Sequence, residues 1–305
     1  MKQEKVCIVI PVYQKISDAL EIISLKQGLK VFNSHPVIFI CPNSFDESWL
    51  DEYKNFHPKI SFEKFDNKNF TDVNSYSLLL LSQNFYARFL NYNFMLIYQL
   101  DAYVFRDELE YWCDRGFDYI GAPWFLIDAP WFDANLPMFQ YLDKTEKILL
   151  PNAGNGGFSL KNIQKVRELL QRRISFLEVL KLKKMSKKFR MIQRKHGFLA
   201  KKIIFTKLFL KFAFRKNLFS EVCDYLFSGD DCPSEDAIFA FAYPLIFPEF
   251  KVAKSSEAIP FSFEAYPEKL YEMNGKNLPF GCHSYHKYSP EFWQKFIPTI
   301  YTHSS

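Results

Sequence analysis

Residues 94–105 read FMLIYQLDAYVF, an apolar run of strand length that carries a single acid, Asp101. A carboxylate at the end of an apolar strand lies where open α/β sheets form their ligand crevice, at the carboxyl edge of the strands. Mg²⁺ and Mn²⁺ prefer carboxylate and phosphate oxygens, so an acid there can hold a cation that bridges a diphosphate. On spacing alone, capping of the next loop explains Asp101 equally well.

On both sides of this run, apolar strands alternate with helices. The unbroken run KVCIVIPVY at 5–13 is typical of a parallel strand buried on both faces. We expect further strands at 35–42, 60–65 and 118–124, and helices capped by Ser17, over 76–90 and over 107–116. This order predicts an α/β fold with one open, largely parallel sheet and right-handed crossovers.

The composition is that of a folded chain, with 48% hydrophobic and 24% charged residues among 305. Apolar residues at 6–13 are too few for a signal peptide or a membrane span. The six cysteines show no paired spacing, and without an export signal we expect free thiols in the cytoplasm.

Charge is segregated along the chain. Of 39 basic and 34 acidic residues, 19 basic and two acidic ones lie between Lys161 and Lys216. Apolar residues recur from Ile163 at helical spacing, so we treat 161–220 as a basic, amphipathic helical insertion into a domain formed by 1–160 and 221–305. A solvated face, a nucleic-acid surface or a membrane contact could each explain it. Interleaved Phe, Leu and Ile favour an anionic membrane surface, and no nucleic-acid motif accompanies the charge.

Two short motifs could carry chemistry. PNAGNGGFSLK, 151–161, has three glycines that allow close approach to the main chain, although a turn before a strand is the more frequent meaning of such a pattern. CPSEDAIFAFAY, 232–243, places Glu235 and Asp236 at the start of an apolar helix that Ser234 could cap. Helix-terminus electrostatics explain this pair most simply, and a general base is the functional alternative.

Near the end, PFGCHSYHKY holds His283 and His286 beside Cys282. The cysteines lack the spacing of a zinc site. One histidine near a bound diphosphate is the better interpretation of this motif.

Together these motifs resemble known sequences. VCIVIPVY resembles the first strand of GT-A glycosyltransferases. YSLLLLSQNFY, MLIYQLDAYVFRDELEYWC, DYIGAPW, NGGFSLK and PFGCHSYHKY, in that order, resemble a glycosyltransferase-like family, domain-of-unknown-function family 5672. The likeness covers most of 5–160 and resumes at about 230–293, and the long motif around Asp101 is its most specific part.

The resemblance implies a GT-A-like fold and assigns roles to residues. Donor binding falls to Pro11, Val12, Tyr13, Asp101 and Tyr103, with Asp101 as the first acid of a DxD motif whose third position is Tyr103 instead of Asp. Sugar and acceptor contacts fall to Trp124, Asn155, Gly156, Gly157 and Phe158, and catalysis to Asp236 with Glu235. With Tyr103 in place of the second acid, either a divalent cation, Mn²⁺ or Mg²⁺, is held by Asp101 with His283 or His286, or the enzyme acts without a metal.

These expectations lead to three hypotheses. The first is a cytoplasmic glycosyltransferase, peripheral on the inner membrane face, that moves a sugar from a nucleotide-sugar donor to a glycan or to a lipid-linked, lipopolysaccharide-type acceptor. The second is a catalytically silent scaffold of the same fold, which the missing second acid of DxD favours. The third makes the basic region a nucleic-acid surface and the rest of the chain a nucleotide-handling enzyme. The first hypothesis is favoured, and with it no nucleic-acid partner is expected.

Overall fold

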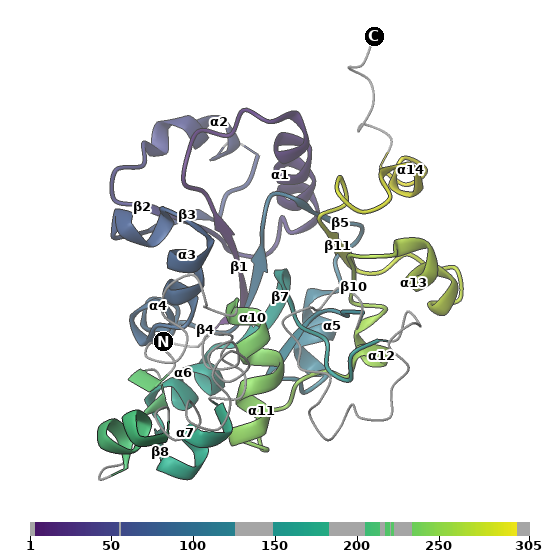
Figure 1. Cartoon of the computed structure of the whole chain (residues 1–305). Helices are drawn as coiled ribbons and strands as arrows, with labels where there is room; N and C mark the ends of the chain where they lie inside the picture. The colour runs from purple at the N-terminus through teal and green to yellow at the C-terminus, as the bar shows by residue number, and fades with distance from the viewer. Residues whose placement is uncertain are drawn as a thin grey trace.

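A six-stranded sheet in the order β3-β2-β1-β4-β7-β6 forms the centre of the protein (Figure 1). The structure is a computed structural model, and it describes residues 4–54, 56–125, 149–182, 205–213, 217–219, 221–222 and 234–297. The strands are β1 (Glu4–Pro11), β2 (Val37–Pro42), β3 (Ile60–Phe65), β4 (Tyr92–Tyr98), β6 (Tyr119–Ala122) and β7 (Asn155–Asn162). Neighbours from β3 to β4 pair in parallel, whereas β7 is antiparallel to β4 and β6. The predicted α/β class with a mixed, mostly parallel sheet flanked by helices is confirmed.

Alternate residues of β1 enter two hydrophobic clusters, one on each face of the sheet. Val6, Ile8 and Ile10 share a cluster with buried residues of α1 (Ala19–Val31) and α5 (Leu109–Asp114). Cys7 and Val9 share the other with α3 (Val73–Leu80), α4 (Gln83–Ala87) and α6 (Ile163–Gln171). Because successive side chains of a strand point to opposite faces, an unbroken apolar run is what a strand covered on both faces needs.

Two predicted helix boundaries differ from those observed. Asp18, not Ser17, caps α1, because its carboxylate accepts hydrogen bonds from the backbone N–H groups of Leu20 (2.8 Å) and Glu21 (3.2 Å). The helix expected over 76–90 is two helices, α3 and α4. Ser82 caps the second by accepting from the Phe85 N–H at 3.2 Å, so a local side-chain bond competes with a continuous helix.

The run at 94–105 is likewise broken. A turn closed by a hydrogen bond from the Ala102 N–H to the Gln99 carbonyl (2.9 Å) separates β4 from β5 (Ala102–Val104). Strand β5 joins a second sheet of order β10-β11-β5, with β10 at Ser262–Phe263 and β11 at Gly281–His283. Its antiparallel register sets His283 opposite Ala102. The turn therefore places Asp101 at the carboxyl end of β4 and beside β11.

The basic segment is partly built into the core. Lys161 belongs to β7, so the predicted boundary at 161 falls inside a strand of the sheet. Beyond it, α6, α7 (Phe176–Leu182) and the helix at 205–212 contribute buried residues to one cluster: Ile163, Val166, Leu169, Leu170, Val179, Leu182, Leu208 and Phe212. Residues 183–204, 214–216 and 220 of the predicted insertion lie outside the described residues.

Short elements complete the chain. They are η1 (Glu47–Leu50), α2 (Asp51–Lys54), η2 (Asn67–Phe70), β8 (Arg173–Ile174), β9 (Asn217–Leu218), α10 (Glu235–Ala237), the π-helical η5 (Ile238–Ala242), α11 (Tyr243–Ile246), α12 (Ser255–Ala258), α13 (Pro267–Met273) and α14 (Pro290–Trp293). Within the described ranges, every helix is too short or too polar to cross a membrane. The described cysteines, Cys7, Cys41, Cys113 and Cys282, are free and buried.

Candidate active site

A cleft of about 590 Å³ opens at the carboxyl ends of β1 and β4. The sheet order reverses between these two strands, and ligands of open α/β sheets bind at such a reversal. Pro11, Val12 and Tyr13 line it from the end of β1, and Asp101 lines it from the turn after β4. The remaining lining is Gln14, Ile16, Glu21, Phe70, Thr71, Asp72, Val73, Tyr76, Gln99, Leu100, His286 and Lys287.

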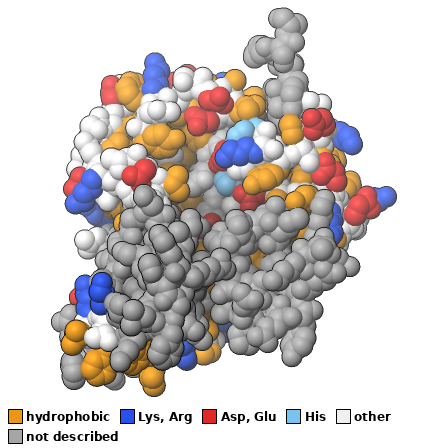
Figure 2. Space-filling model, in the orientation of Figure 1, with side chains coloured by type: hydrophobic (Ala, Val, Ile, Leu, Met, Phe, Trp, Pro, Cys, Tyr) orange, Lys and Arg blue, Asp and Glu red, His pale blue; other side chains and the backbone are white. Residues whose placement is uncertain are grey.

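The charges around this cleft are mostly negative. Among the described residues that line it, three carboxylates, of Glu21, Asp72 and Asp101, face one lysine, Lys287, and one histidine, His286. In Figure 2, acidic, basic and histidine side chains meet in the upper half of the face shown. An anionic ligand such as a diphosphate would be repelled by these carboxylates unless a cation accompanied it.

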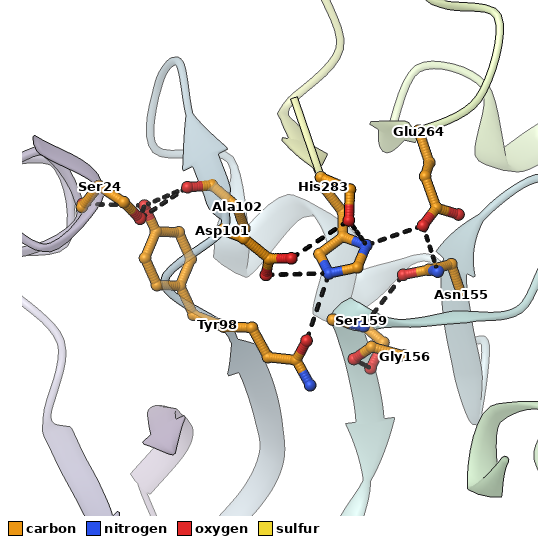
Figure 3. Close-up of polar contacts among 12 residues, drawn as sticks. Ser24, Tyr98, Asp101, Ala102, Asn155, Gly156, Ser159, Glu264 and His283 are labelled. Atoms are coloured by element: carbon orange, nitrogen blue, oxygen red, sulfur yellow. Dashed lines mark hydrogen bonds and ion pairs between the residues drawn. The ribbon is translucent and has the colours of Figure 1, made fainter. Parts of the chain in front are cut away.

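Asp101 contacts a histidine that is itself held by a second carboxylate (Figure 3). His283 Nε2 lies 3.1 Å from Asp101 Oδ1 and 3.2 Å from Gln99 Oε1, and its Nδ1 lies 2.9 Å from Glu264 Oε1. Ser284 Oγ donates to the other Asp101 oxygen at 3.1 Å. Both ring nitrogens of His283 are therefore engaged by acceptors.

The two partners shift each other's pKa. Burial disfavours the charged forms of both, raising the pKa of Asp101 and lowering that of His283. Their contact outweighs it: His283 brings the pKa of Asp101 down to about 2, while Asp101 and Glu264 bring that of His283 up to about 10. In the absence of other ligands, His283 is a charged imidazolium at neutral pH.

Asn155 extends this network along β7. Its amide donates to Glu264 Oε1 at 2.7 Å, and its side-chain oxygen accepts from the Gly157 N–H at 3.0 Å. A Cβ on Gly157 would lie 2.0 Å from His283 Nε2. Gly157 is therefore required because the His283 ring lies against the backbone there. This glycine of the glycine-rich motif makes room for a side chain of the protein itself.

The start of α10 brings a second pair of acids against β7. Asp236 Oδ2 accepts from the Gly156 N–H at 3.1 Å, and Oδ1 accepts from the Ala237 N–H at 2.7 Å and from the Ser234 hydroxyl. Burial raises the pKa of Asp236 to about 7, and the negative charge of Glu235 adds to this rise. A carboxylate with its pKa near neutrality suits a general base.

Lys161 compensates this acidic pair from the interior. Its Nζ lies 3.6 Å from Glu235 Oε1 and 4.8 Å from the centre of the Phe239 ring, and its side chain has no solvent exposure. Burial lowers the pKa of this ammonium group. The Lys161–Glu235 ion pair balances the charge of Glu235 next to Asp236. A buried charge is stable only when it is paired.

The family described as protein of unknown function (DUF5672) matches residues 59–283, which is most of the chain. The chain belongs to this family. The comparison with curated proteins finds no match. Among solved structures, the chain is similar to the apo crystal structure of mouse xyloside xylosyltransferase 1, with 10% sequence identity and a TM-score of 0.47 over 92% of this chain and 97% of that chain.

In this DUF5672 protein, some predicted site residues lie elsewhere than expected. The Tyr103 ring packs on Phe105 and Tyr285, with centroids 5.3 and 6.1 Å apart, and Tyr103 is not among the described residues that line the cleft. Tyr103 follows β4 by way of the turn and belongs to β5, which directs it into the small sheet. It therefore does not stand where the second DxD acid was expected.

Two predicted sugar contacts are packing residues in this structure. Phe158 has no solvent exposure and packs on Tyr98 and Phe280, with ring centres 6.0 and 5.2 Å away. Trp124 stacks on Phe241 at 6.0 Å and lies against Gly154, where a Cβ would come within 2.6 Å of the indole. Phe158 is therefore a core residue, whereas Trp124 is only partly buried, and the sugar contact of Trp124 stays a prediction.

A divalent cation fits part of the predicted ligand set. Asp101 and His283 are suitable ligands that touch, but in the described ranges no three His, Cys, Asp or Glu side chains gather as a metal ion requires. His286 lines the cleft without completing such a group, so the predicted trio of Asp101, His283 and His286 is not assembled.

Three residues of the network were missed in the sequence. Glu264 follows β10 and Gln99 follows β4. Lys161 belongs to β7, but in the sequence it reads as the first residue of the basic insertion. Glu264 ends an apolar stretch, PFSFE, and this is the same strand-end signal that singled out Asp101. The pairing of Glu264 with a histidine 19 positions later has no signal in local spacing.

Proposed function

We propose that this DUF5672 member is a glycosyltransferase that uses a nucleotide-sugar donor. The observation that carries the proposal is the position of Asp101, at the strand-order reversal and in a cleft that Pro11, Val12 and Tyr13 also line. These are the residues that the likeness to GT-A glycosyltransferases assigns to the donor. The proposal draws further support from Asp236, a carboxylate whose pKa is raised to about 7 beside the same strand, β7, that approaches His283.

In the proposed reaction, an acceptor hydroxyl attacks the anomeric carbon of the donor sugar. The new carbon–oxygen bond forms as the bond to the diphosphate breaks, and the nucleoside diphosphate leaves with the electron pair. Asp236, in its ionised form, takes the proton of the acceptor hydroxyl. Asp101 and His283 would hold a divalent cation, which supplies positive charge to the leaving diphosphate when bound. Attack of this kind would invert the anomeric carbon.

We further propose a lipid-linked, lipopolysaccharide-type acceptor at the cytoplasmic face of a membrane. The support is a patch on α7 and the helix at 205–212, where Leu177 and Leu210 are 71% and 70% exposed. Phe176, Phe205 and Phe209 join the two helices by mutual ring contacts. Exposed lysines, Lys181, Lys207 and Lys211, accompany them. We call these eight residues the α7 patch; hydrophobic and basic side chains gather at the lower left of Figure 2, over α7 of Figure 1.

Donor turnover tests the proposal. Purified protein is incubated with a panel of nucleotide sugars and Mn²⁺, and release of nucleoside diphosphate is measured with and without membrane lipid extracts. We expect one donor to be consumed, with Asp236→Asn slower by about 10²-fold to 10⁴-fold, the usual contribution of a general base. Binding of a nucleotide without turnover of any donor would contradict the transferase and favour a scaffold.

A further inference from the structure

The predicted metal set lacks a third protein ligand, and the turn after β4 offers one. Gln99 Oε1 lies 3.2 Å from His283 Nε2, and Asp101 Oδ1 lies 3.1 Å from the same nitrogen. An octahedral cation with bonds of about 2.1 Å sets neighbouring ligand atoms about 3 Å apart. The distances from the histidine nitrogen to the two oxygens therefore match those between ligand atoms on adjacent positions of one cation.

The other side of the histidine ring matches this arrangement. A metal-bound histidine usually donates its second N–H to a carboxylate, which fixes the ring. Nδ1 of His283 meets Glu264 Oε1 at 2.9 Å, and Asn155 holds the same oxygen at 2.7 Å. Glu264 therefore leaves Nε2 as the nitrogen that faces Gln99 and Asp101.

The backbone fixes Gln99 in this position. Its N–H donates to the Gly157 carbonyl at 2.9 Å, and its own carbonyl accepts from Ala102 at 2.9 Å to close the turn. Gln99 and Asp101 are two residues apart, which is the spacing of the two acids in a DxD motif. The second oxygen ligand thus lies before Asp101 in the sequence, whereas Tyr103, after it, packs in the small sheet.

We propose that Gln99, Asp101 and His283 are the protein ligands of one divalent cation, with Glu264 as the residue that orients His283. The inference deepens the proposed function, since the cation is the partner that a diphosphate needs among the carboxylates of the cleft. The cation would replace the Nε2 proton of the His283 imidazolium, which is released to solvent. One carboxylate with a neutral amide and a neutral imidazole would then leave the cation a net positive charge. That charge would attract the diphosphate, whose oxygens and water complete the shell.

Binding of Mn²⁺ alone tests this set without any donor. The free ion is followed by its electron paramagnetic resonance signal during titration of the wild type, Gln99→Leu, Gln99→Glu and Glu264→Gln, with Tyr103→Phe as the matched control. We expect one bound Mn²⁺ in the wild type and in Tyr103→Phe. Affinity should fall about tenfold in Gln99→Leu and 10-fold to 100-fold in Glu264→Gln, and rise about tenfold in Gln99→Glu because a carboxylate replaces an amide.

Two results would overturn the proposal: no Mn²⁺ bound by the wild type at millimolar concentration, or equal affinity in the wild type and both Gln99 variants. Because Gln99→Glu keeps the size of the side chain, it answers the question even if Gln99→Leu does not fold. The assay also separates this inference from the proposed function. A protein that binds Mn²⁺ through Gln99 but turns over no donor contradicts only the transferase, and metal-dependent turnover with unchanged affinity in the Gln99 variants contradicts only the ligand set.

Discussion

At the scale of single residues, the candidate site depends on pairs of charges that burial forces together. His283 lies between the carboxylates of Asp101 and Glu264. Lys161 lies beside Glu235, and both side chains are buried. Asp236 differs from these residues, because backbone N–H groups and a hydroxyl hold it and, in the part of the chain that the structure describes, no cation contacts it directly. This difference explains why burial raises the pKa of Asp236 to about 7, whereas the contact with His283 holds that of Asp101 at about 2.

The pH dependence of turnover follows from Asp236. Burial and the neighbouring charge of Glu235 raise its pKa to about 7, with Glu264 adding to the rise. The carboxyl is therefore protonated and unable to accept a proton below this pH, and ionised above it. We expect the rate of donor turnover to increase as the pH rises through about 7. The measurement is the pH profile of kcat under saturating donor.

Glu235→Gln is the matched variant for this profile. It removes a negative charge beside Asp236 and keeps the side-chain size, so the pKa of Asp236 falls and the acid limb should move to lower pH. Glu264, which follows β10, and the cation Lys161 of β7 also act on the pair. A limb that stays in place, or moves upward, would show that Asp236 is not the titrating base.

At the residue level, the sequence indicated the position of Asp101 because its signal is local. Asp101 ends an apolar strand, and the structure does place it in a cleft. Gln99 and Glu264 could not be found in this way, because their roles depend on the register of β11 against β5 and β10. Gln99 and His283 are 184 positions apart in the sequence, and Glu264 and His283 are 19 apart, so local patterns of polarity do not record either contact.

At the scale of elements, strands were predicted better than the ends of helices. Continuous apolar runs identified β1, β2 and β4, because a strand covered on both faces needs apolar side chains at successive positions. The division of 76–90 into α3 and α4, and of 94–105 into β4 and β5, depends on individual hydrogen bonds of Ser82 and Ala102. Such bonds interrupt a helix or strand without changing the apolar pattern of the sequence, so the pattern does not reveal them.

The cap of α1 provides a test at this scale. Asp18 accepts two backbone hydrogen bonds, whereas Ser17 is exposed and precedes the cap. We expect Asp18→Ala to lower the free energy of unfolding by about 1 kcal/mol, the usual worth of an N-cap, and Ser17→Ala to leave it unchanged. Urea unfolding followed by circular dichroism measures both. A larger loss in Ser17→Ala would mean that the helix begins one residue earlier.

At the scale of the whole molecule, two functional surfaces are proposed on one sheet. The cleft lies at the carboxyl ends of β1 and β4, and the α7 patch lies on helices that share the core cluster of α3, α4 and α6. In Figure 1, α7 and the cleft-lining helix α3 lie on the same side of the sheet. The sequence indicated a basic and apolar surface, but it could not show that the segment begins inside β7.

Membrane contact can be tested on the α7 patch. We expect the wild type to co-sediment with vesicles that contain phosphatidylglycerol, and Leu177→Glu and Leu210→Glu each to weaken this binding by about tenfold, because each removes the burial of one leucine. Phe56→Glu is the control, since Phe56 is 72% exposed between α2 and β3, away from the patch. Equal loss in all three variants, or in none, would contradict a membrane contact through α7.

The central claim, that the cleft beside Asp101 binds the nucleotide part of a sugar donor, is tested most directly by thermal unfolding with nucleoside diphosphates and Mn²⁺. A ligand at about 100 times its Kd adds about 2.7 kcal/mol, a shift in Tm of several degrees. We predict that one nucleotide stabilises the wild type, that Asp101→Ala loses this response, and that Asp107→Ala, which removes a carboxylate 3.0 Å from His35, retains it. Two results would contradict the account: equal stabilisation of Asp101→Ala and the wild type, or no stabilisation of the wild type by any nucleotide.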